Sequence, residues 1–244
     1  MNGHFTPSLV AFDLDGTLTQ HKSPMSPEIR AALDTLRSRG ITLVMVGAGG
    51  CARIARQMEE YPIDIFGNYG MQYAVWDGAT RSHRLVADEH RPCDRESVMR
   101  RAAALRQKFG WTQFAGDSVE FHDSGVVTFA LLGTRAEPAA KLAFDPDRSK
   151  RRAAYADVCS AFSEYNVFVG GSSSFDMAPR PFDKAWAMDR LCTGRGLAKE
   201  QVLFVGDDYG PGGNDESVLR AGFPFLKIDD YRDTPNLLLK RVLQ

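Results

Sequence analysis

The sequence has little excess charge and no long apolar run. Its 244 residues carry a formal net charge of −1 at pH 7, so no overall field draws the chain to nucleic acid or to an anionic membrane. No apolar stretch approaches the length of a membrane-spanning helix. Residues 1–7 have neither a basic start nor an apolar core, so we expect no signal peptide. We therefore expect neither nucleic acid nor a membrane as a partner.

Cysteine is scarce and scattered. The four cysteines are Cys51, Cys93, Cys159 and Cys192. No C-x-x-C pair occurs among them, so the sequence indicates neither a zinc knuckle nor a disulfide framework. We expect four reduced, mostly buried thiols in a cytoplasmic protein.

Two acids follow an apolar stretch near the start of the chain. In "SLVAFDLDGTLTQH", residues 8–21, five mostly apolar residues lead directly to Asp13 and Asp15. Asp is unfavourable in strands, and two like charges this close repel unless a cation lies between them. The stretch therefore predicts a bound cation, a positively charged substrate or a reaction that uses both acids. Taken alone it also fits a solvated turn, whereas an EF-hand loop would place its glycine sixth and follow a helix.

Strands and helices alternate at both ends of the chain, in which 43% of residues are hydrophobic. Continuous apolar runs at 8–12, 41–46 and 202–206 are typical of strands covered on both faces, and 63–66 is a further candidate. A serine followed by proline opens a helix at Ser26. This rhythm predicts an α/β fold with a doubly wound, Rossmann-like parallel sheet.

Between these ends the pattern changes to hairpins mixed with helices. Alternating residues surround a Ser124-Gly125 turn, and helices are expected over about 95–109 and 147–162. This mixture predicts an inserted α+β domain with an antiparallel sheet. The expected division is a core of residues 1–79 and 175–244 and an insert of residues 80–174.

Polar segments follow three of the expected strands. Asp13 and Asp15 follow the first, "GAGG" (Gly47–Gly50) the second, and "GDD" (Gly206–Asp208) the strand at 202–206. Because the carboxyl ends of parallel strands meet at one edge of a sheet, these segments should converge on one crevice. The acids there, joined by Asp215, are hard oxygen ligands suited to Mg²⁺. Mg²⁺ commonly binds carboxylates together with a substrate phosphate, so the pattern predicts phosphate chemistry.

Several segments together resemble the haloacid dehalogenase superfamily. They are "DLDGTLT", an isolated Lys184 and "GDDYGPGGND", with the insert placed as in its IIB subgroup. "GPGGNDESV", "GGSSSFDMAPRPFDK" and "VEFHDSGVVTFALLGTR" are similar, in order and spacing, to segments of the eukaryotic-type phosphomannomutases. The likeness covers nearly the full length. It implies a C2B-type cap over the core and a small phosphorylated sugar as substrate, and it is compatible with a homodimer formed through the cap.

The resemblance also implies roles for the residues of the core. Asp13 would be the nucleophile that forms an aspartyl-phosphate. Asp15 would protonate the leaving alkoxide and later activate the acceptor, while Lys184 would neutralise phosphate charge. The implied Mg²⁺ ligands are Asp13, Asp15 through its carbonyl, Asp207, Asn214 and Asp215. The implied phosphate-binding N–H groups belong to Gly16 and Thr17.

The second motif departs from the family. The family has a Ser or Thr that binds the phosphate, whereas Gly47–Gly50 carry no hydroxyl. Backbone N–H groups at the start of the following helix, that of Gly47 among them, could bind phosphate instead. A plain strand-to-helix turn fits Gly49 and Gly50 equally well.

The cap departs further. Phosphomannomutases hold the distal phosphate of a sugar bisphosphate with several arginines. His122 stands at the first such position, Arg135 lies near a second with a shifted register, Lys141 is nearest to a third, and Lys22 stands near a core arginine. Neither His nor Lys replaces the bidentate contact of Arg. Asp176 matches a residue that contacts sugar hydroxyls; His122 also fits an ordinary surface position, and Asp176 a hinge cap.

These observations favour a Mg²⁺-dependent phosphatase of small sugar phosphates that acts through an aspartyl-phosphate at Asp13. All the acids that the chemistry needs are present in the core. The cap positions that would bind the second phosphate of a reorienting bisphosphate carry fewer arginines than the family has. The alternative is a phosphomannomutase-type sugar-phosphate mutase. A noncatalytic sugar-phosphate binding protein is less favoured, because Asp13 and Asp15 are both present.

Overall fold

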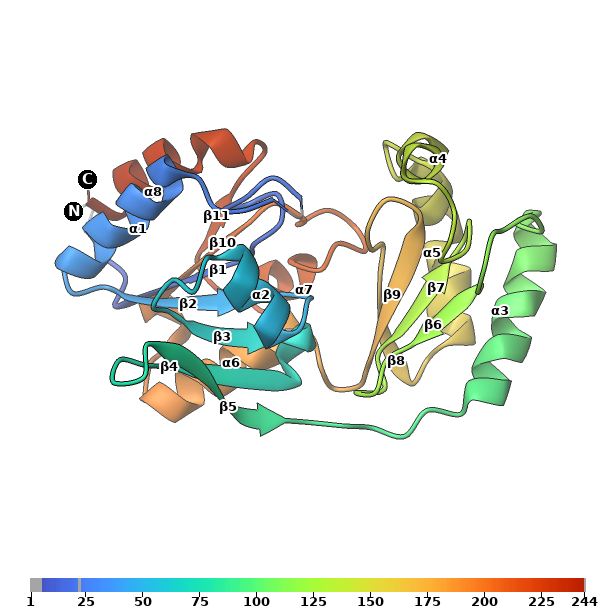
Figure 1. The fold of residues 1–244 in the computed structure, drawn as a ribbon, viewed down its shortest axis with the longest axis horizontal. Helices are drawn as coiled ribbons and strands as arrows, with labels where there is room; N and C mark the ends of the chain where they lie inside the picture. Colours follow the sequence, from blue (N-terminus) through green and yellow to red (C-terminus); the bar gives the residue numbers. More distant parts are fainter. Residues whose placement is uncertain (1–5, 22, 244) are drawn as a thin grey trace. The chain divides into compact units, whose positions relative to one another are not determined.

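The computed structural model describes residues 6–21 and 23–243 (Figure 1). The chain forms two compact units, each with its own sheet. The first unit contains the chain up to Asp88, Lys184–Tyr209 and the chain from Asp215 onward, and the second contains Glu89–Asp183 and Gly210–Asn214. Lys22, which was expected near the substrate, lies outside the described residues.

The first unit is built on a seven-stranded sheet in the order β11-β10-β1-β2-β3-β4-β5. The strands are β1 Leu9–Phe12, β2 Thr42–Val46, β3 Asp64–Gly67, β4 Gln72–Asp77, β5 Ser82–Asp88, β10 Val202–Gly206 and β11 Phe225–Lys227. The strands from β11 to β3 run parallel, and β4 and β5 are added antiparallel. The predicted α/β fold, with a parallel core sheet and a second, smaller sheet, is confirmed.

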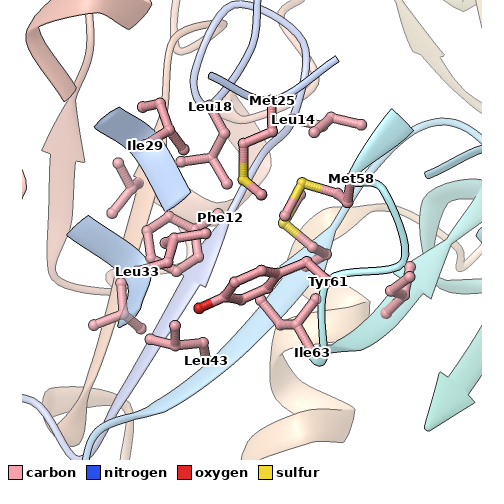
Figure 2. Packing of buried hydrophobic residues seen from close by; sticks show 14 of the residues in the cluster. Phe12, Leu14, Leu18, Met25, Ile29, Leu33, Leu43, Met58, Tyr61 and Ile63 are labelled. Atoms are coloured by element: carbon pink, nitrogen blue, oxygen red, sulfur yellow. The ribbon is translucent and has the colours of Figure 1, made fainter. Parts of the chain in front are cut away.

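Strand β1 is apolar throughout because both of its faces are covered. Val10 and Phe12 point into one hydrophobic cluster, shown in Figure 2, and Leu9 and Ala11 point into another. Residues of α1, α2 and α8 complete the first cluster, and residues of α6 and α7 complete the second. The helices are α1 Pro27–Ser38, α2 Cys51–Gln57, α6 Lys184–Arg195, α7 Glu216–Arg220 and α8 Thr234–Leu243. Burial on two sides explains the unbroken apolar run that the sequence shows.

The hairpin β4–β5 extends the first sheet. Strand β5 pairs with β4, and β4 pairs with β3. The expected boundary at residue 80 falls inside this hairpin, whereas the units divide between Asp88 and Glu89 and again between Asp183 and Lys184. An alternating hairpin has the same sequence pattern in either sheet, so the pattern alone does not assign β5 to one unit.

The second unit has a four-stranded antiparallel sheet in the order β6-β7-β9-β8. Its elements are α3 Arg95–Phe109, β6 Val119–Phe121, β7 Val127–Ala130, α4 Pro138–Phe144, α5 Ser149–Ala161, β8 Tyr165–Phe168 and β9 Ser174–Pro179. Phe129, Phe175 and Met177 of the sheet pack with Val98 of α3 and Val158 of α5 in one cluster. One sheet face therefore carries the core. The two longer helices lie where the sequence predicts them, and α4 was not expected.

The segment Gly210–Asn214 belongs to the second unit although its neighbours on both sides belong to the first. The N–H of Val169 donates to the carbonyl of Gly212 at 2.8 Å. Gly212 has φ +78°, and a Cβ at this position would lie 2.9 Å from Cγ2 of Val169. The loop therefore requires glycine here, both for its left-handed conformation and for its close contact with Val169.

The remaining helical elements are short. They are 3₁₀ helices at Asn68–Gly70, Lys199–Gln201 and Tyr231–Asp233. The longest helix, α3, has 15 residues. Within the described part of the chain, no helix combines the length and the hydropathy that a membrane crossing requires.

A pair of leucine truncations tests the first core. Leu33 of α1 is fully buried, whereas Leu237 of α8 is 38% exposed. Leu33→Ala removes buried methyl groups and leaves a cavity, so it should lower the free energy of unfolding by about 2–5 kcal/mol. Leu237→Ala should change it by less than about 0.5 kcal/mol. Urea denaturation followed by circular dichroism measures both, and equal losses would contradict the packing described here.

Candidate active site

Three carboxylates meet at the carboxyl ends of β1 and β10. Asp13 follows β1, Asp207 follows β10 and Asp215 precedes α7. The two strands are parallel neighbours with Phe12 opposite Val205, and the N–H of Asp13 donates to the carbonyl of Val205 at 2.9 Å. One oxygen from each acid lies within 4.8 Å of the others. Strand register thus gathers acids that are far apart in the sequence.

One buried ammonium lies among these acids. Lys184, the first residue of α6, is fully buried, and its Nζ lies 2.6 Å from Oδ1 of Asp13 and 2.7 Å from Oδ1 of Asp215. Oδ2 of Asp215 accepts the N–H of Asp208 at 3.0 Å. Burial alone would lower the pKa of Lys184, but the charges of Asp13 and Asp215 outweigh it and raise this pKa. The lysine therefore stays protonated.

Two of the acids have raised pKa values. Burial, followed by the charges of Asp13 and Asp215, raises the pKa of Asp207 to about 8. Burial also raises the pKa of Asp215 to about 7, although Lys184 opposes the shift. Three carboxylates around one ammonium hold more negative charge than the site neutralises.

This set of ligands fits a small divalent cation. Carboxylate oxygens are the ligands that Mg²⁺ takes in proteins, and a cation would relieve the excess negative charge. Among the described acids, Asp13, Asp207 and Asp215 are placed to hold one. Asn214 belongs to the segment that packs in the second unit. Metal contacts by Asn214 and by the carbonyl of Asp15 stay predictions.

Gly16 and Thr17 shape the loop beside Asp207. Gly16 has φ +92°, and a Cβ there would lie 2.7 Å from Cγ of Asp207, so only glycine fits. The Thr17 hydroxyl donates to Oδ1 of Asp207 at 2.8 Å. The N–H of Gly16 donates to Thr19 and that of Thr17 to Leu14. Both N–H groups close the loop here, and a phosphate contact by either stays a prediction.

Asp15 has different partners from Asp13. Nη2 of Arg53 donates to its Oδ2 at 3.1 Å, and Nε2 of Gln57 donates to its Oδ1 at 2.7 Å. His21 lies farther away, with Nδ1 3.9 Å from Oδ2. The motif thus sends its two acids into two separate environments.

Arg53 and Gln57 were not expected at the site. They lie four residues apart on α2 and therefore share one helix face. The sequence does carry a signal for them, because α2 directly follows the second-motif glycines and the carboxyl end of β2, and that position places it at the edge of the site. Polar residues on a short amphipathic helix are otherwise typical of a solvated face.

Glycines of the second motif have packing roles. The N–H of Gly47 donates to the carbonyl of Phe66 at 2.9 Å, and a Cβ on Gly47 would lie 2.7 Å from Cδ1 of Ile54. Helix α2 begins after Gly50 without a capping hydroxyl. Oε1 of Gln72, on β4, instead accepts the N–H of Cys51 at 2.9 Å. Phosphate binding by Gly47 stays a prediction.

In the second unit, two residues expected at the substrate share one hydrogen-bond chain. Nε2 of His122 lies 3.3 Å from the hydroxyl of Thr128, which donates to Oδ1 of Asp176 at 3.0 Å. Thr128 and Asp176 are opposite one another on β7 and β9. The neighbours Phe129 and Phe175 face the core, so these polar residues occupy the other sheet face. Thr128 was not expected here, because a lone threonine in a strand is common.

Arg135 and Lys141 do not join this chain. His122 begins the turn of the β6–β7 hairpin, where its N–H donates to Val126. Arg135 lies past the opposite end of β7, where its N–H donates to Ala115. Nζ of Lys141 donates to the carbonyl of Thr134 at 2.9 Å. The hairpin register separates His122 from Arg135, so the two do not form one cluster.

The chain is similar in sequence to proteins of known family. Residues 10–71, which include both acids of the first motif, match the family of haloacid dehalogenase-like hydrolases. A phosphomannomutase of Schizosaccharomyces pombe is 27% identical over 242 residues, covering 88% of this chain and 86% of its own. Phosphomannomutase 1 of Homo sapiens is 24% identical over 222 residues, covering 86% and 82%. The chain is therefore similar to haloacid dehalogenase-like hydrolases over residues 10–71 and to phosphomannomutases over most of its length. The family resemblance predicted from the sequence is confirmed.

Solved structures show the same fold. A haloacid dehalogenase-like hydrolase from B. subtilis is similar with TM-score 0.62 and 17% identity, over 90% of this chain and 88% of that one. The IMP-nucleotidase of Plasmodium falciparum is similar with TM-score 0.71 and 12% identity, over 98% and 62%. The family match and the relatives support an enzyme, either a phosphohydrolase or a phosphomannomutase.

Removing the charge of Asp207 should stabilise the metal-free protein. Because its folded pKa of about 8 lies above the ordinary 3.8, ionisation of Asp207 opposes folding, and this cost grows as pH rises from about 4 to about 8. Asp207→Asn keeps an acceptor for Thr17. In chelator it should raise the free energy of unfolding by roughly 1–3 kcal/mol at pH 8 and by less at pH 5.

The same two proteins are also compared with Mg²⁺ in place of the chelator. Mg²⁺ should raise the melting temperature of the native chain and not that of Asp207→Asn. Asp157→Asn removes an acid of the second unit that pairs with Lys108, and it should leave both measurements nearly unchanged. Equal stabilisation of the native chain and Asp207→Asn by Mg²⁺ would remove Asp207 from the metal site.

Proposed function

We propose that the chain is a Mg²⁺-dependent phosphatase of small sugar phosphates that acts through a phosphorylated Asp13. The observation that carries the proposal is the group formed by the buried Asp13, Lys184 and Asp215 and the half-buried Asp207 at the ends of parallel strands. Phosphoryl transfer depends on positioning and charge neutralisation more than on a strong base. A carboxylate beside a fixed ammonium meets both needs.

In the proposed first step, Asp13 takes the phosphoryl group from the sugar. Lys184 contacts Oδ1 of Asp13, so Oδ2 is the atom proposed to attack phosphorus. A bond forms between Oδ2 and phosphorus while the bond from phosphorus to the sugar oxygen breaks. The electron pair stays on that oxygen, which receives a proton from Asp15. The products are phospho-Asp13 and the free sugar.

In the second step, water replaces the sugar. Asp15, now ionised, takes a proton from water as the water oxygen bonds to phosphorus. The bond between phosphorus and Oδ2 breaks, which releases inorganic phosphate and restores the Asp13 carboxylate. Bound through Asp13 and Asp207, Mg²⁺ would supply positive charge to the phosphate oxygens. Lys184 contributes a further fixed charge through its contact with Asp13.

The second unit is proposed to serve as the cap that selects the sugar. The sheet face opposite its core carries the hydrogen-bond chain of His122, Thr128 and Asp176. A carboxylate and a hydroxyl exchange hydrogen bonds readily with sugar hydroxyls. Arg135 and Lys141 are proposed to act at the edge of this surface, away from the chain.

A phosphomannomutase-type mutase is the second candidate. It is favoured by the relatives, since curated phosphomannomutases cover most of this chain. A mutase must hold the far phosphate of a bisphosphate while the sugar turns, and must exclude water meanwhile. His122 already lies beside a hydroxyl, and Arg135 lies at the other end of the hairpin. This arrangement suits a hydroxyl better than a second phosphate, which favours the phosphatase.

Replacing the proposed nucleophile tests the chemistry directly. Asp13→Asn keeps the shape of the side chain but removes its charge, so turnover of sugar phosphates should fall below a tenth of the native rate. The far-ultraviolet circular dichroism should be unchanged. Asp189→Asn removes an acid of α6 whose side chain is 52% exposed and should keep native turnover. A phosphate-release assay measures both, and one tenth or more of native activity in Asp13→Asn would refute the aspartyl-phosphate.

Product partitioning separates phosphatase from mutase. Mannose 1-phosphate or glucose 1-phosphate, primed with the matching 1,6-bisphosphate, should yield mainly inorganic phosphate by phosphorus NMR. His122→Arg adds a bidentate phosphate ligand and should shift the product ratio toward the 6-phosphate by about twofold or more. His90→Arg adds the same side chain at another exposed position of the second unit and should not.

Each alternative has its own result in this experiment. Predominant 6-phosphate from the native chain would refute the phosphatase and establish the mutase. Binding of a sugar phosphate without turnover of any substrate would favour a noncatalytic binding protein.

A further inference from the structure

Asp15 is held at both of its oxygens by one face of α2. Arg53 donates to Oδ2 at 3.1 Å, and Gln57 donates to Oδ1 at 2.7 Å. The two donors are joined to each other, because Nη1 of Arg53 donates to Oε1 of Gln57 at 2.9 Å. Nε2 of Gln57 also donates to the hydroxyl of Thr19 at 2.9 Å. The carboxylate is therefore oriented by two donors and tied to its own loop.

Gly49 leaves room for this arrangement. A Cβ at Gly49 would lie 2.7 Å from Cζ of Arg53, closer than ordinary contacts allow. The guanidinium of Arg53 therefore lies against the backbone of Gly49 while it donates to Asp15. Any side chain at this position would displace the end of Arg53 from its present place.

A single ion pair would not orient Asp15 firmly. The side chain of Arg53 is 41% exposed, and that of Asp15 is 18% exposed. Exposed pairs contribute little and hold their geometry loosely. A second donor on the other oxygen restricts rotation of the carboxylate, and the Thr19 contact restricts Gln57 in turn. Orientation of this kind is what a proton donor needs, since a misplaced acid loses much of its effect.

We infer that Arg53 and Gln57 are positioning residues, which aim the Asp15 carboxyl at the leaving oxygen of the substrate. The inference rests on the proposed function, in which Asp15 gives its proton to that oxygen as the phosphorus–oxygen bond breaks. Their effect should therefore depend on how much the leaving group needs a proton. A sugar alkoxide needs one, and p-nitrophenolate does not.

The experiment compares kcat/KM for a sugar 1-phosphate and for p-nitrophenyl phosphate. This ratio reports the steps up to formation of phospho-Asp13, so the later attack of water does not mask the effect. Arg53→Ala and Gln57→Ala should each lower kcat/KM for the sugar phosphate by about 10²-fold, within the range of acid catalysis. For p-nitrophenyl phosphate they should lower it by less than about threefold.

Two further variants refine the test. Gly49→Ser adds a Cβ under the guanidinium and should show the same selective loss, in smaller measure. Arg53→Lys keeps a charge without the fork and should recover part of the sugar-phosphate activity. Arg56→Ala removes an exposed arginine of the same helix and should behave as the native chain on both substrates.

The outcomes are distinguishable. Equal losses on the two substrates in Arg53→Ala and Gln57→Ala would overturn the positioning role, since a damaged fold or a lost phosphate contact affects both alike. Rescue of Arg53→Ala by Gly49→Ser would also overturn it, because one hydroxyl has a single donor and cannot replace the pair of Arg53 and Gln57 at both oxygens of Asp15. No turnover of either substrate by the native chain would overturn the proposed function and this inference together.

Discussion

A buried contact between one ammonium and two carboxylates organises the first unit around its site. Lys184 is fully enclosed and touches both Asp13 and Asp215. Removing one partner of a buried ion pair commonly costs about 3–5 kcal/mol, because the remaining charge stays buried. The helix that begins with this lysine packs Ala187 and Met188 into the cluster on one face of the sheet. The position of the ammonium is therefore set by hydrophobic packing, and the acids are arranged around it.

The D-x-D-G segment resolves the repulsion of its acids by separating them. Asp13 turns to the buried Lys184, whereas Asp15 turns to Arg53 and Gln57 on the surface of α2. Asp13 shares the ammonium of Lys184 with Asp215, whereas Asp15 pairs with Arg53, so the two acids of the motif do not compete for one cation. The left-handed Gly16 follows directly and lets Asp207 approach the loop. One short segment can in this way present two carboxylates in different surroundings, which is a requirement for giving them different tasks.

The core sheet and the meeting of its acids could be predicted from the sequence, because both follow from the burial and the parallel direction of the strands. Continuous apolar runs identify β1, β2 and β10, and parallel strands deliver Asp13 and Asp207 to one edge. Features that depend on side-chain reach could not be read. Gln57 is indistinguishable from a solvated residue until α2 is placed over Asp15. The separation of His122 from Arg135 depends on the register of one hairpin, which residue types alone do not fix.

The loop Gly210–Asn214 has a consequence for domain grafting. At its base, the N–H of Asp215 donates a hydrogen bond to the carbonyl of Asp208. At its tip, the carbonyl of Gly212 accepts a hydrogen bond from the N–H of Val169 in the second unit. Joining Asp88 directly to Lys184 would delete that partner and leave the tip of the loop without its packing. The second unit therefore cannot be removed or exchanged as one continuous segment of the chain. An exchange of this unit between related proteins would have to carry the loop with it, or supply a new residue in the place of Val169.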